Sequence, residues 1–476
     1  MNIFFAQISN EHEKQTHIDK SLLKKIMVFT ALSAIIALTV SVAAGNTFIK
    51  SVPAGPLPLP LTNSVSDYDY YLQGGIIVDG GGMQPYVGDI AFKNGKIVAV
   101  GDNLSPRGNG IILDASGYYV TPGFIDIHTH ADEYWEKEND GAPILMQGVT
   151  TQIVGNCGTS VADISAYLQA ADGRAINVGT LIGLKALRQM FISDGAALTP
   201  AVLKKICAQT AAAIDAGAFG LSVGLEYYPQ NKTTTEQMQQ LAEVVASKGA
   251  ILTCHSRSES NNLIAAVTEA VQIAETTGVK LQYSHLKAYG QANWDKQQQA
   301  IQLLTEARAR GVDIMTDVHG YTFSSWDFNT NNNPISEDNI IAALRLPYAM
   351  VISDGGLYAG GRANHPRAYA NATYVLTKYL RDGKYFDIQT MIKKMTLMPA
   401  RRMGIKDRGL LKTGSFADIA VFKLEDLQVL ATRGNPMVLS KGMHYVFVNG
   451  RPAVFKGKIT GEKSGKALKF TVNTVN

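Results

Sequence analysis

Short apolar runs alternate with amphipathic segments through the middle of the chain. Runs of this length and composition are typical of strands that are buried on both faces. Eight of them occur, at residues 123–130, 150–155, 177–184, 218–225, 250–255, 280–285, 313–317 and 350–354.

The segments between most of these runs have helical patterns that end at a glycine. Three clear cases are residues 199–216, 234–248 and 293–310, which stop before Gly217, Gly249 and Gly311. Eight strand–helix units over roughly 280 residues predict an α/β fold, a closed (β/α)8 barrel of the TIM type. A doubly wound sheet is the alternative. It usually carries a glycine-rich phosphate turn, which this sequence lacks.

All-β segments flank this middle region on both sides. Residues 68–119 and 406–476 contain short alternating strands, and each segment has an Asn-Gly hairpin signal, at 94–95 and 449–450. We predict that both ends pair into one small β-sandwich domain, with the barrel at residues 120–405 between its two parts.

The N-terminus resembles a targeting segment. Lys20, Lys24 and Lys25 precede the uncharged run 26–44, and small residues follow it. This pattern predicts a signal peptide within residues 1–50 and an exported protein, periplasmic or secreted. The alternative is an uncleaved membrane anchor, since 19 apolar residues just span a bilayer. Residues 51–67 are proline-rich and are predicted to form an extended linker.

Composition excludes several classes of protein. The 476 residues are 46% hydrophobic and 18% charged, as in ordinary globular proteins. The net charge of +4, to which the N-terminal lysines contribute, is too small to indicate a basic surface that binds nucleic acid. Three cysteines are too few for a disulfide scaffold, so the fold depends on its core and at least one thiol stays free.

Side chains that can bind a metal stand at the ends of the apolar runs. Alternate side chains of a strand share a face, so Asp126, His128 and His130 are predicted to point the same way. In a barrel all these ends face one mouth, where active sites form. The alternative is a set of buried, hydrogen-bonded histidines, but four of the nine histidines end such runs. The candidates are His128, His130, Cys157, Glu226, His255, His285, Lys287, Asp317, His319 and Asp354.

Imidazole and thiolate ligands indicate zinc. Zinc lowers the pKa of bound water to about 7, which supplies hydroxide at neutral pH. A nearby carboxylate can accept the proton of this water and pass it to a leaving amine, and Asp354 is placed for that role. The predicted reaction is hydrolysis of an amide or a similar carbonyl bond. Cys157, in a Gly-Asn-Cys-Gly turn, is the predicted thiolate, whereas Cys207 and Cys254 are predicted to pack in the core.

Seven motifs carry a resemblance to a known family: PGFIDIHTH (122–130), GNCG (155–158), GLSVGLEY (220–227), HSRSE (255–259), SHLK (284–287), SDG (353–355) and HPR (365–367). From about residue 68 onward, the chain resembles the metal-dependent amidohydrolase superfamily, specifically its D-aminoacylase (N-acyl-D-amino-acid deacylase) group. The first motif is generic to the superfamily, and the cysteine of the second is more specific. Many relatives instead bridge two metals with a carbamylated lysine, and the fourth run offers none.

The resemblance implies a role for each matching residue. Cys157, His255 and His285 correspond to a tight zinc site. A second, weaker site corresponds to His128, His130 and Asp354, of which Asp354 is also the general acid/base. The free carboxylate of a small-molecule substrate would be held by Lys287 and Arg367, and the planar guanidinium suits that task. The alternative is that these two cations are solvated surface charges.

The chain departs from the family pattern in three places. After the seventh run, relatives have a tyrosine that contacts the substrate, where this chain has His319. An inserted subdomain is reduced here to residues 321–353, which predicts a more open site. Gly183-Leu184 replaces a common Gly-His pair.

Together these features predict an exported zinc hydrolase that cleaves N-acyl-D-amino acids. Two alternatives remain: an amidohydrolase acting on a cyclic amide or an unusual dipeptide, and a metal-binding barrel without catalysis.

Overall fold

The computed structural model describes residues 63–138, 140–193 and 195–471. The predicted signal peptide and most of the predicted linker lie outside these residues. Within the described part, no helix has the length and apolar character that a membrane crossing needs.

The strands predicted from the apolar runs form parallel pairs in three sheets. In the largest of these three sheets the strands stand in chain order, without the reversal that a doubly wound sheet would have. The predicted α/β class is confirmed. The first sheet contains β11 (Asn177–Thr180), β10 (Val149–Val154) and β8 (Phe124–Asp126). The second contains β12 (Ile182–Gly183), β13 (Gly220–Gly224), β14 (Ile251–His255), β15 (Lys280–Tyr283), β16 (Ile314–Val318) and β17 (Ala349–Val351). The third contains β9 (Thr129–His130) and β18 (Gly355–Gly356).

Two of the predicted strands are broken, the third run at Leu181 and the first run at the candidate site. The first run ends as β8 at Asp126 and resumes as β9 at Thr129, because β8 pairs with β10 whereas β9 pairs with β18. The prediction that Asp126 shares one strand face with His128 and His130 is therefore wrong. Asp126 instead accepts a hydrogen bond from Ser353 Oγ at 2.5 Å.

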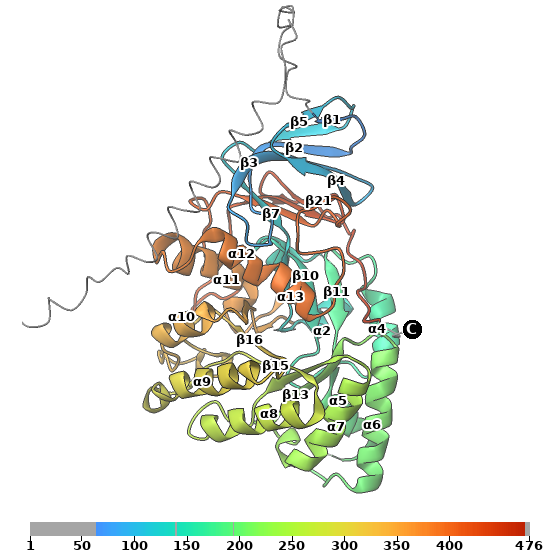
Figure 1. Cartoon of the computed structure of the whole chain (residues 1–476), viewed down its shortest axis with the longest axis vertical. Helices are drawn as coiled ribbons and strands as arrows, with labels where there is room; N and C mark the ends of the chain where they lie inside the picture. Colours follow the sequence, from blue (N-terminus) through green and yellow to red (C-terminus); the bar gives the residue numbers. More distant parts are fainter. Residues whose placement is uncertain (1–62, 139, 194, 472–476) are drawn as a thin grey trace, which may run out of the picture. The chain divides into compact units, whose positions relative to one another are not determined.

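Helices connect the parallel strands, and α7 to α10 follow one another beside β13, β15 and β16 (Figure 1). Thr199 and Thr234 cap α6 and α7 with their side chains, as their positions before the helical patterns predict. The α-helices are α2 (Asp132–Lys137), α3 (Ala142–Leu145), α4 (Ile164–Ala171), α5 (Leu184–Phe191), α6 (Pro200–Asp215), α7 (Thr235–Ser247), α8 (Leu263–Thr277), α9 (Lys296–Ala309), α10 (Glu337–Arg345), α11 (Arg367–Tyr374), α12 (Ile388–Met395) and α13 (Leu397–Arg402). Shorter or wider helices are η1 (Gln230–Lys232), η2 (Gln291–Asn293), η3 (Ser325–Asp327), η4 (Ala359–Gly361) and the π-helix η5 (Val375–Asp382).

Both ends of the described chain contribute strands to one nine-stranded sheet. The antiparallel pair β7–β19 joins the N-terminal strands to the C-terminal ones. Both Asn-Gly hairpins are confirmed, because each pair has positive φ and connects paired strands, β3 to β4 and β20 to β21. The strands are β2 (Tyr70–Ile77), β3 (Tyr86–Lys93), β4 (Lys96–Gly101), β6 (Ile111–Asp114), β7 (Tyr119–Pro122), β19 (Ile419–Phe422), β20 (Met443–Val448), β21 (Arg451–Phe455) and β22 (Lys458–Ile459).

Folded structure begins earlier than the sequence predicts. β1 (Asn63–Val65) lies inside the predicted linker and pairs with β5 (Leu104–Pro106). Its last residue, Val65, packs against a small apolar cluster that contains Tyr68 and Tyr71. The prediction of an extended linker now applies only to the residues before β1, which include all prolines of the predicted segment.

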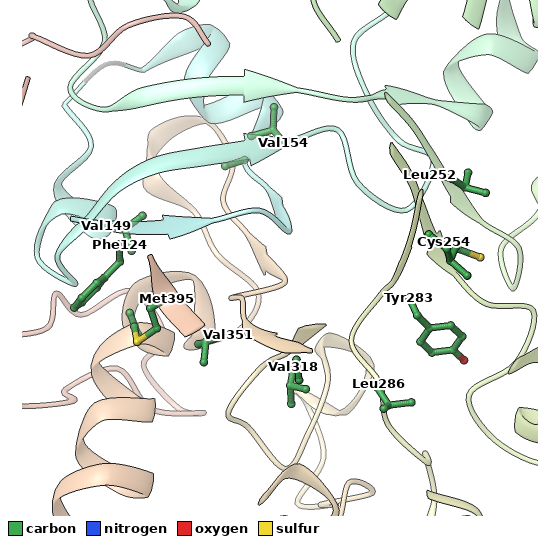
Figure 2. Packing of buried hydrophobic residues seen from close by; sticks show 14 of the residues in the cluster. Phe124, Val149, Val154, Leu252, Cys254, Tyr283, Leu286, Val318, Val351 and Met395 are labelled. Carbon is green, nitrogen blue, oxygen red and sulfur yellow. The ribbon is translucent and has the colours of Figure 1, made fainter. Parts of the chain in front are cut away.

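The main apolar core surrounds the parallel strands, which are buried on both faces. Leu252 and Cys254 lie two residues apart on β14, and both belong to this core (Figure 2). Burial raises the pKa of the Cys254 thiol to about 12, so it stays a neutral packing group. Cys207 on α6 packs against the same core and is half-buried. The predicted packing roles of these two cysteines are confirmed.

Candidate metal centre

Six predicted ligands come together where the parallel strands end. His128 lies in the break between β8 and β9, His130 is the last residue of β9, and Cys157 follows β10. His255 is the last residue of β14, His285 follows β15, and Asp354 stands just before β18. All except His130 are buried. Three groups each have ligand atoms within 4.8 Å of one another: Cys157 with His255 and His285; His128 with His130 and Cys157; and His128 with His285 and Asp354.

The predicted tight set is compact. Cys157 Sγ lies 3.7 Å from His285 Nε2, and His255 Nδ1 lies 3.0 Å from the same nitrogen. One thiolate and two imidazoles at this spacing are a zinc-type donor set.

The predicted second set adjoins the first and is not separate from it. Asp354 Oδ1 lies 3.0 Å from His130 Nε2 and 3.7 Å from His128 Nε2. Cys157 Sγ also lies 3.4 Å from His128 Nε2, so the thiol faces both sets. The sulfur therefore lies between the two sets, as does His285, which also groups with His128 and Asp354.

The backbone at three of the ligands has the left-handed conformation that non-glycine residues rarely adopt. Cys157, His285 and Asp354 have φ values of 50°, 33° and 49°. Such conformations cost about 1–3 kcal/mol each and collect at functional sites. Gln230 fixes the Cys157 turn, because its Nε2 donates to the Cys157 carbonyl at 3.0 Å and its Oε1 accepts from Gly224 N at 2.8 Å.

Without a metal, the thiol and the carboxyl of the cluster are held ionised by imidazoles whose pKa values are raised, and a bound metal would displace the protons of these imidazoles. Burial opposes the ionised thiol, but the charges and hydrogen bonds of His128 and His130 hold the pKa of Cys157 well below its usual value. Burial likewise opposes ionised Asp354, and Arg367 with the nearby histidines outweighs it, so the pKa of this carboxyl is well below normal. Thiolate and carboxylate are the forms that bind metal, so the residues fit zinc.

Asp317 lies behind the ligands and holds two of them in place. This fully buried carboxylate accepts a hydrogen bond from the backbone N–H of His285 at 2.6 Å, and the same oxygen lies 3.5 Å from His128 Nδ1. Metal-binding histidines commonly have a carboxylate on the ring nitrogen that does not bind the metal. The sequence placed Asp317 at a strand end but did not predict this contact.

The two predicted clamp cations are buried, so neither is a solvated surface charge. Lys287 Nζ lies 2.6 Å from Glu259 Oε1 and 2.9 Å from His285 Nδ1. Burial would raise the pKa of Glu259, but Lys287 and His285 hold it far below its usual value. The sequence reasoning assigned no role to Glu259, because only the fold brings it to Lys287.

Arg367 faces the catalytic candidate. One guanidinium nitrogen, Nη2, lies 2.9 Å from Asp354 Oδ2 and 3.2 Å from Ser325 Oγ. Its Nε and Nη1 are buried and have no hydrogen-bond partner among the described residues. Buried donors of this kind are costly unless a ligand accepts from them.

A cavity of about 950 Å³ opens over the cluster, which is within the range of small-molecule sites. His319 is not among the residues that line it. Burial, with the nearby charges of Arg367 and Lys287, holds the pKa of His319 well below normal, so this imidazole is neutral. The lining residues are His130, Glu226, Tyr227, Tyr228, His255, Glu259, Ser260, His285, Lys287, Tyr289, Ser324, Ser325, Trp326, Asp354, Gly356, Tyr358, Asn364 and Arg367.

Comparison with known proteins agrees with this centre. Residues 119–453 match the model of the Amidohydrolase family. An N-acyl-D-glutamate deacylase of Alcaligenes xylosoxydans xylosoxydans is 31% identical over 474 residues, which cover 84% of this chain and 96% of that protein. A D-aminoacylase of the same organism is 28% identical over 478 residues, which cover 85% and 98%.

A solved structure gives the same result. N-acyl-D-glutamate deacylase from Bordetella bronchiseptica, complexed with zinc and a phosphonate inhibitor that mimics the tetrahedral intermediate, has a TM-score of 0.77 and 28% sequence identity. The match covers 85% of this chain and 100% of that one. The resemblance seen in the motifs is confirmed: this chain belongs to the Amidohydrolase family, in its D-aminoacylase group.

Proposed function

We propose that this protein is a zinc-dependent hydrolase that cleaves the amide bond of N-acyl-D-amino acids. The observation that carries the proposal is one cavity that combines a thiolate–imidazole cluster, an ionised Asp354 and the unpartnered donors of Arg367. Zinc held by this cluster supplies Lewis acidity and lowers the pKa of water to about 7. The proposed D configuration of the substrate is supported only by the relatives, whose names specify D-amino acids.

Asp354 is the proposed general base. Its Oδ1 faces the imidazoles of His128 and His130, and its Oδ2 faces Arg367. Because its pKa is far below normal, the carboxylate is ionised at neutral pH and can accept a proton there. The same carboxyl then returns the proton to the leaving amine.

Arg367 is the proposed partner of the substrate carboxylate. Its buried Nε and Nη1 remain available, and a carboxylate that accepts from a guanidinium donor gives a strong, oriented contact. Lys287 adds positive charge to the same cavity. A bound substrate would thereby lie with its amide between Asp354 and the cluster.

We infer one tight zinc site at Cys157, His255 and His285, and a weaker one at His128, His130 and Asp354. Unequal sites are supported by the second set itself, because His130 is partly exposed and Asp354 already pairs with Arg367. His319 is proposed to shape the cavity from behind, since it is buried next to Arg367.

We also infer that the three parallel sheets are parts of one closed (β/α)8 barrel. Backbone hydrogen bonds bridge them, from Phe219 N, directly before β13, to the Thr180 carbonyl of β11 and from Asp354 N to the His128 carbonyl. The nine-stranded sheet would then belong to the small β-sandwich domain. Export, with cleavage or retention of the segment before residue 50, remains a proposal from the sequence.

The decisive experiment measures amine release from paired N-acetyl-D- and N-acetyl-L-amino acids by the zinc-loaded protein, with Asp354→Asn as the inactive control. We expect release from the D series alone, and loss of this release in the variant. Release from a cyclic amide or a dipeptide, but not from the D series, would replace the substrate. Bound zinc with no hydrolysis of any amide would identify a binding barrel without catalysis.

A further inference from the structure

The cavity contains an aromatic side chain that the proposed chemistry does not use. Trp326 is 79% exposed, the largest exposed fraction among the large hydrophobic side chains of the described chain. It nevertheless lines the active-site cavity. An exposed aromatic surface at a binding site is a candidate contact for an apolar group of a ligand.

Trp326 stands next to the proposed carboxylate partner. Its neighbour in the chain, Ser325, accepts a hydrogen bond from Arg367 Nη2 at 3.2 Å. In an α-amino acid the carboxylate and the side chain branch from the same carbon atom. Because Trp326 and Arg367 line the same cavity, a substrate whose carboxylate binds Arg367 can direct its side chain towards Trp326.

The turn that carries Trp326 is held from several sides. Ser324 Oγ donates to Asp327 Oδ2 at 2.7 Å and accepts from Trp326 N at 3.3 Å. Tyr289 Oη donates to Asp327 Oδ1 at 2.7 Å, and Arg433 Nη1 donates to the Asp327 carbonyl at 2.7 Å. These bonds fix the backbone position from which Trp326 extends at the edge of the cavity.

The charges of the cavity oppose an acidic side chain. Lys287 and Arg367 are the only lysine and arginine among its described lining residues, and each already has a carboxylate partner, Glu259 and Asp354. Glu226 adds a further carboxylate to the wall. A second substrate carboxylate would thus meet no free cation among these residues.

We propose that Trp326 determines the amino-acid specificity of this site and selects N-acyl-D-amino acids with large apolar, above all aromatic, side chains. This inference rests on the proposed function. The opposite rim carries Tyr228, which follows β13, whereas Trp326 follows β16, three strands further along the sheet. The acyl group extends towards Tyr228 and the amino-acid side chain towards Trp326.

The test compares kcat/KM for N-acetyl-D-phenylalanine, D-leucine, D-alanine and D-glutamate. We expect the wild-type protein to prefer phenylalanine and to be poorest with glutamate. Trp326→Ala should lower the phenylalanine-to-alanine ratio by roughly tenfold, the equivalent of about 1.4 kcal/mol, and Trp326→Phe should restore most of it. Tyr228→Ala should leave this ratio near the wild-type value.

The matched control is Tyr385→Ala, since Tyr385 is an exposed aromatic residue that does not line the cavity. Three results would overturn the proposal. They are an unchanged phenylalanine-to-alanine ratio in Trp326→Ala, a preference of the wild-type protein for glutamate, and a fall of that ratio in Tyr228→Ala instead of in Trp326→Ala. Each of these results still requires amine release from the D series. A wild-type protein that releases no amine would instead refute the proposed function.

Discussion

Replacing Asp317 with asparagine tests whether a carboxylate behind the ligands maintains the metal centre. The hydrogen bonds around Asp317 leave an asparagine side chain no orientation in which it accepts from both neighbouring donors. Arg402 Nε donates to Gln282 Oε1 at 3.2 Å, which directs Gln282 Nε2 at Asp317 Oδ2, 2.6 Å away. The other carboxylate oxygen accepts from His285 N at 2.6 Å. Two fixed donors thus face a group that, as asparagine, offers only one acceptor.

The expected size of the effect follows from this mismatch. Hydrogen bonds to a charged group contribute about 1.5–3 kcal/mol, and a buried donor without a partner costs about 1–3 kcal/mol. Since one of the two bonds can persist, we expect Asp317→Asn to lower the free energy of unfolding of the zinc-free protein by about 2–4 kcal/mol. The positions of His285 and His128 should also loosen, with a roughly 10- to 100-fold loss of zinc affinity.

Two assays separate these effects: urea denaturation of the zinc-free protein and competition of the folded protein with a zinc chelator. The matched control is Asp418→Asn, because Asp418 is also a buried carboxylate whose two oxygens accept from fixed donors, Asn449 N at 2.7 Å and Asn177 Nδ2 at 3.0 Å, but it contacts none of the ligands. Asp418→Asn should affect stability alone. If Asp317→Asn bound zinc as tightly as Asp418→Asn, the Asp317 carboxylate would have no role in holding the ligands.

Two other predictions concern single side chains. Cys157→Ala should abolish tight zinc binding and hydrolysis, whereas Cys254→Ala should keep full zinc content, as measured by metal analysis of the purified variants. Burial lowers the pKa of Lys394 to about 8, against about 10.4 in an unfolded chain. Between about pH 8 and pH 10.4 the amine of Lys394 is neutral in the folded state and still protonated in the unfolded chain. The free energy of unfolding should therefore rise with pH over this range, by about 3 kcal/mol in total. Denaturation of wild type and Lys394→Met from pH 7.5 to 10.5 should show this rise only in wild type, and parallel curves would contradict it.

The sequence predicts the location of the site because parallel strands that point the same way must end at one edge. Apolar runs with His255 and His285 at or just after their ends are visible without any structure. The same reasoning brings Cys157 and Asp354 to this edge although they lie far apart in the chain. What it lacks is the backbone conformation, since the left-handed φ of Cys157 has no signal in its residue type.

Alternation along a strand fails where pairing changes partner. Asp126 precedes His128 by two residues, yet β8 ends there and the carboxylate turns to Ser353. The contacts of Glu259 and Asp317 were missed for a related reason. Their partners, Lys287 and His285, come from other strands, so only the folded register decides which pair meets.

The structure also separates two residues that the family resemblance treats alike. Lys287 Nζ already pairs with Glu259 Oε1 at 2.6 Å and lies 2.9 Å from the ring of His285. Arg367 uses only Nη2 and keeps two buried donors without partners among the described residues. A substrate carboxylate could bind Arg367 without breaking an existing contact, whereas at Lys287 it would share the single Nζ with Glu259. Arg367 is therefore the stronger candidate for the carboxylate contact, and Lys287 is better placed to hold Glu259 and the His285 ring in position.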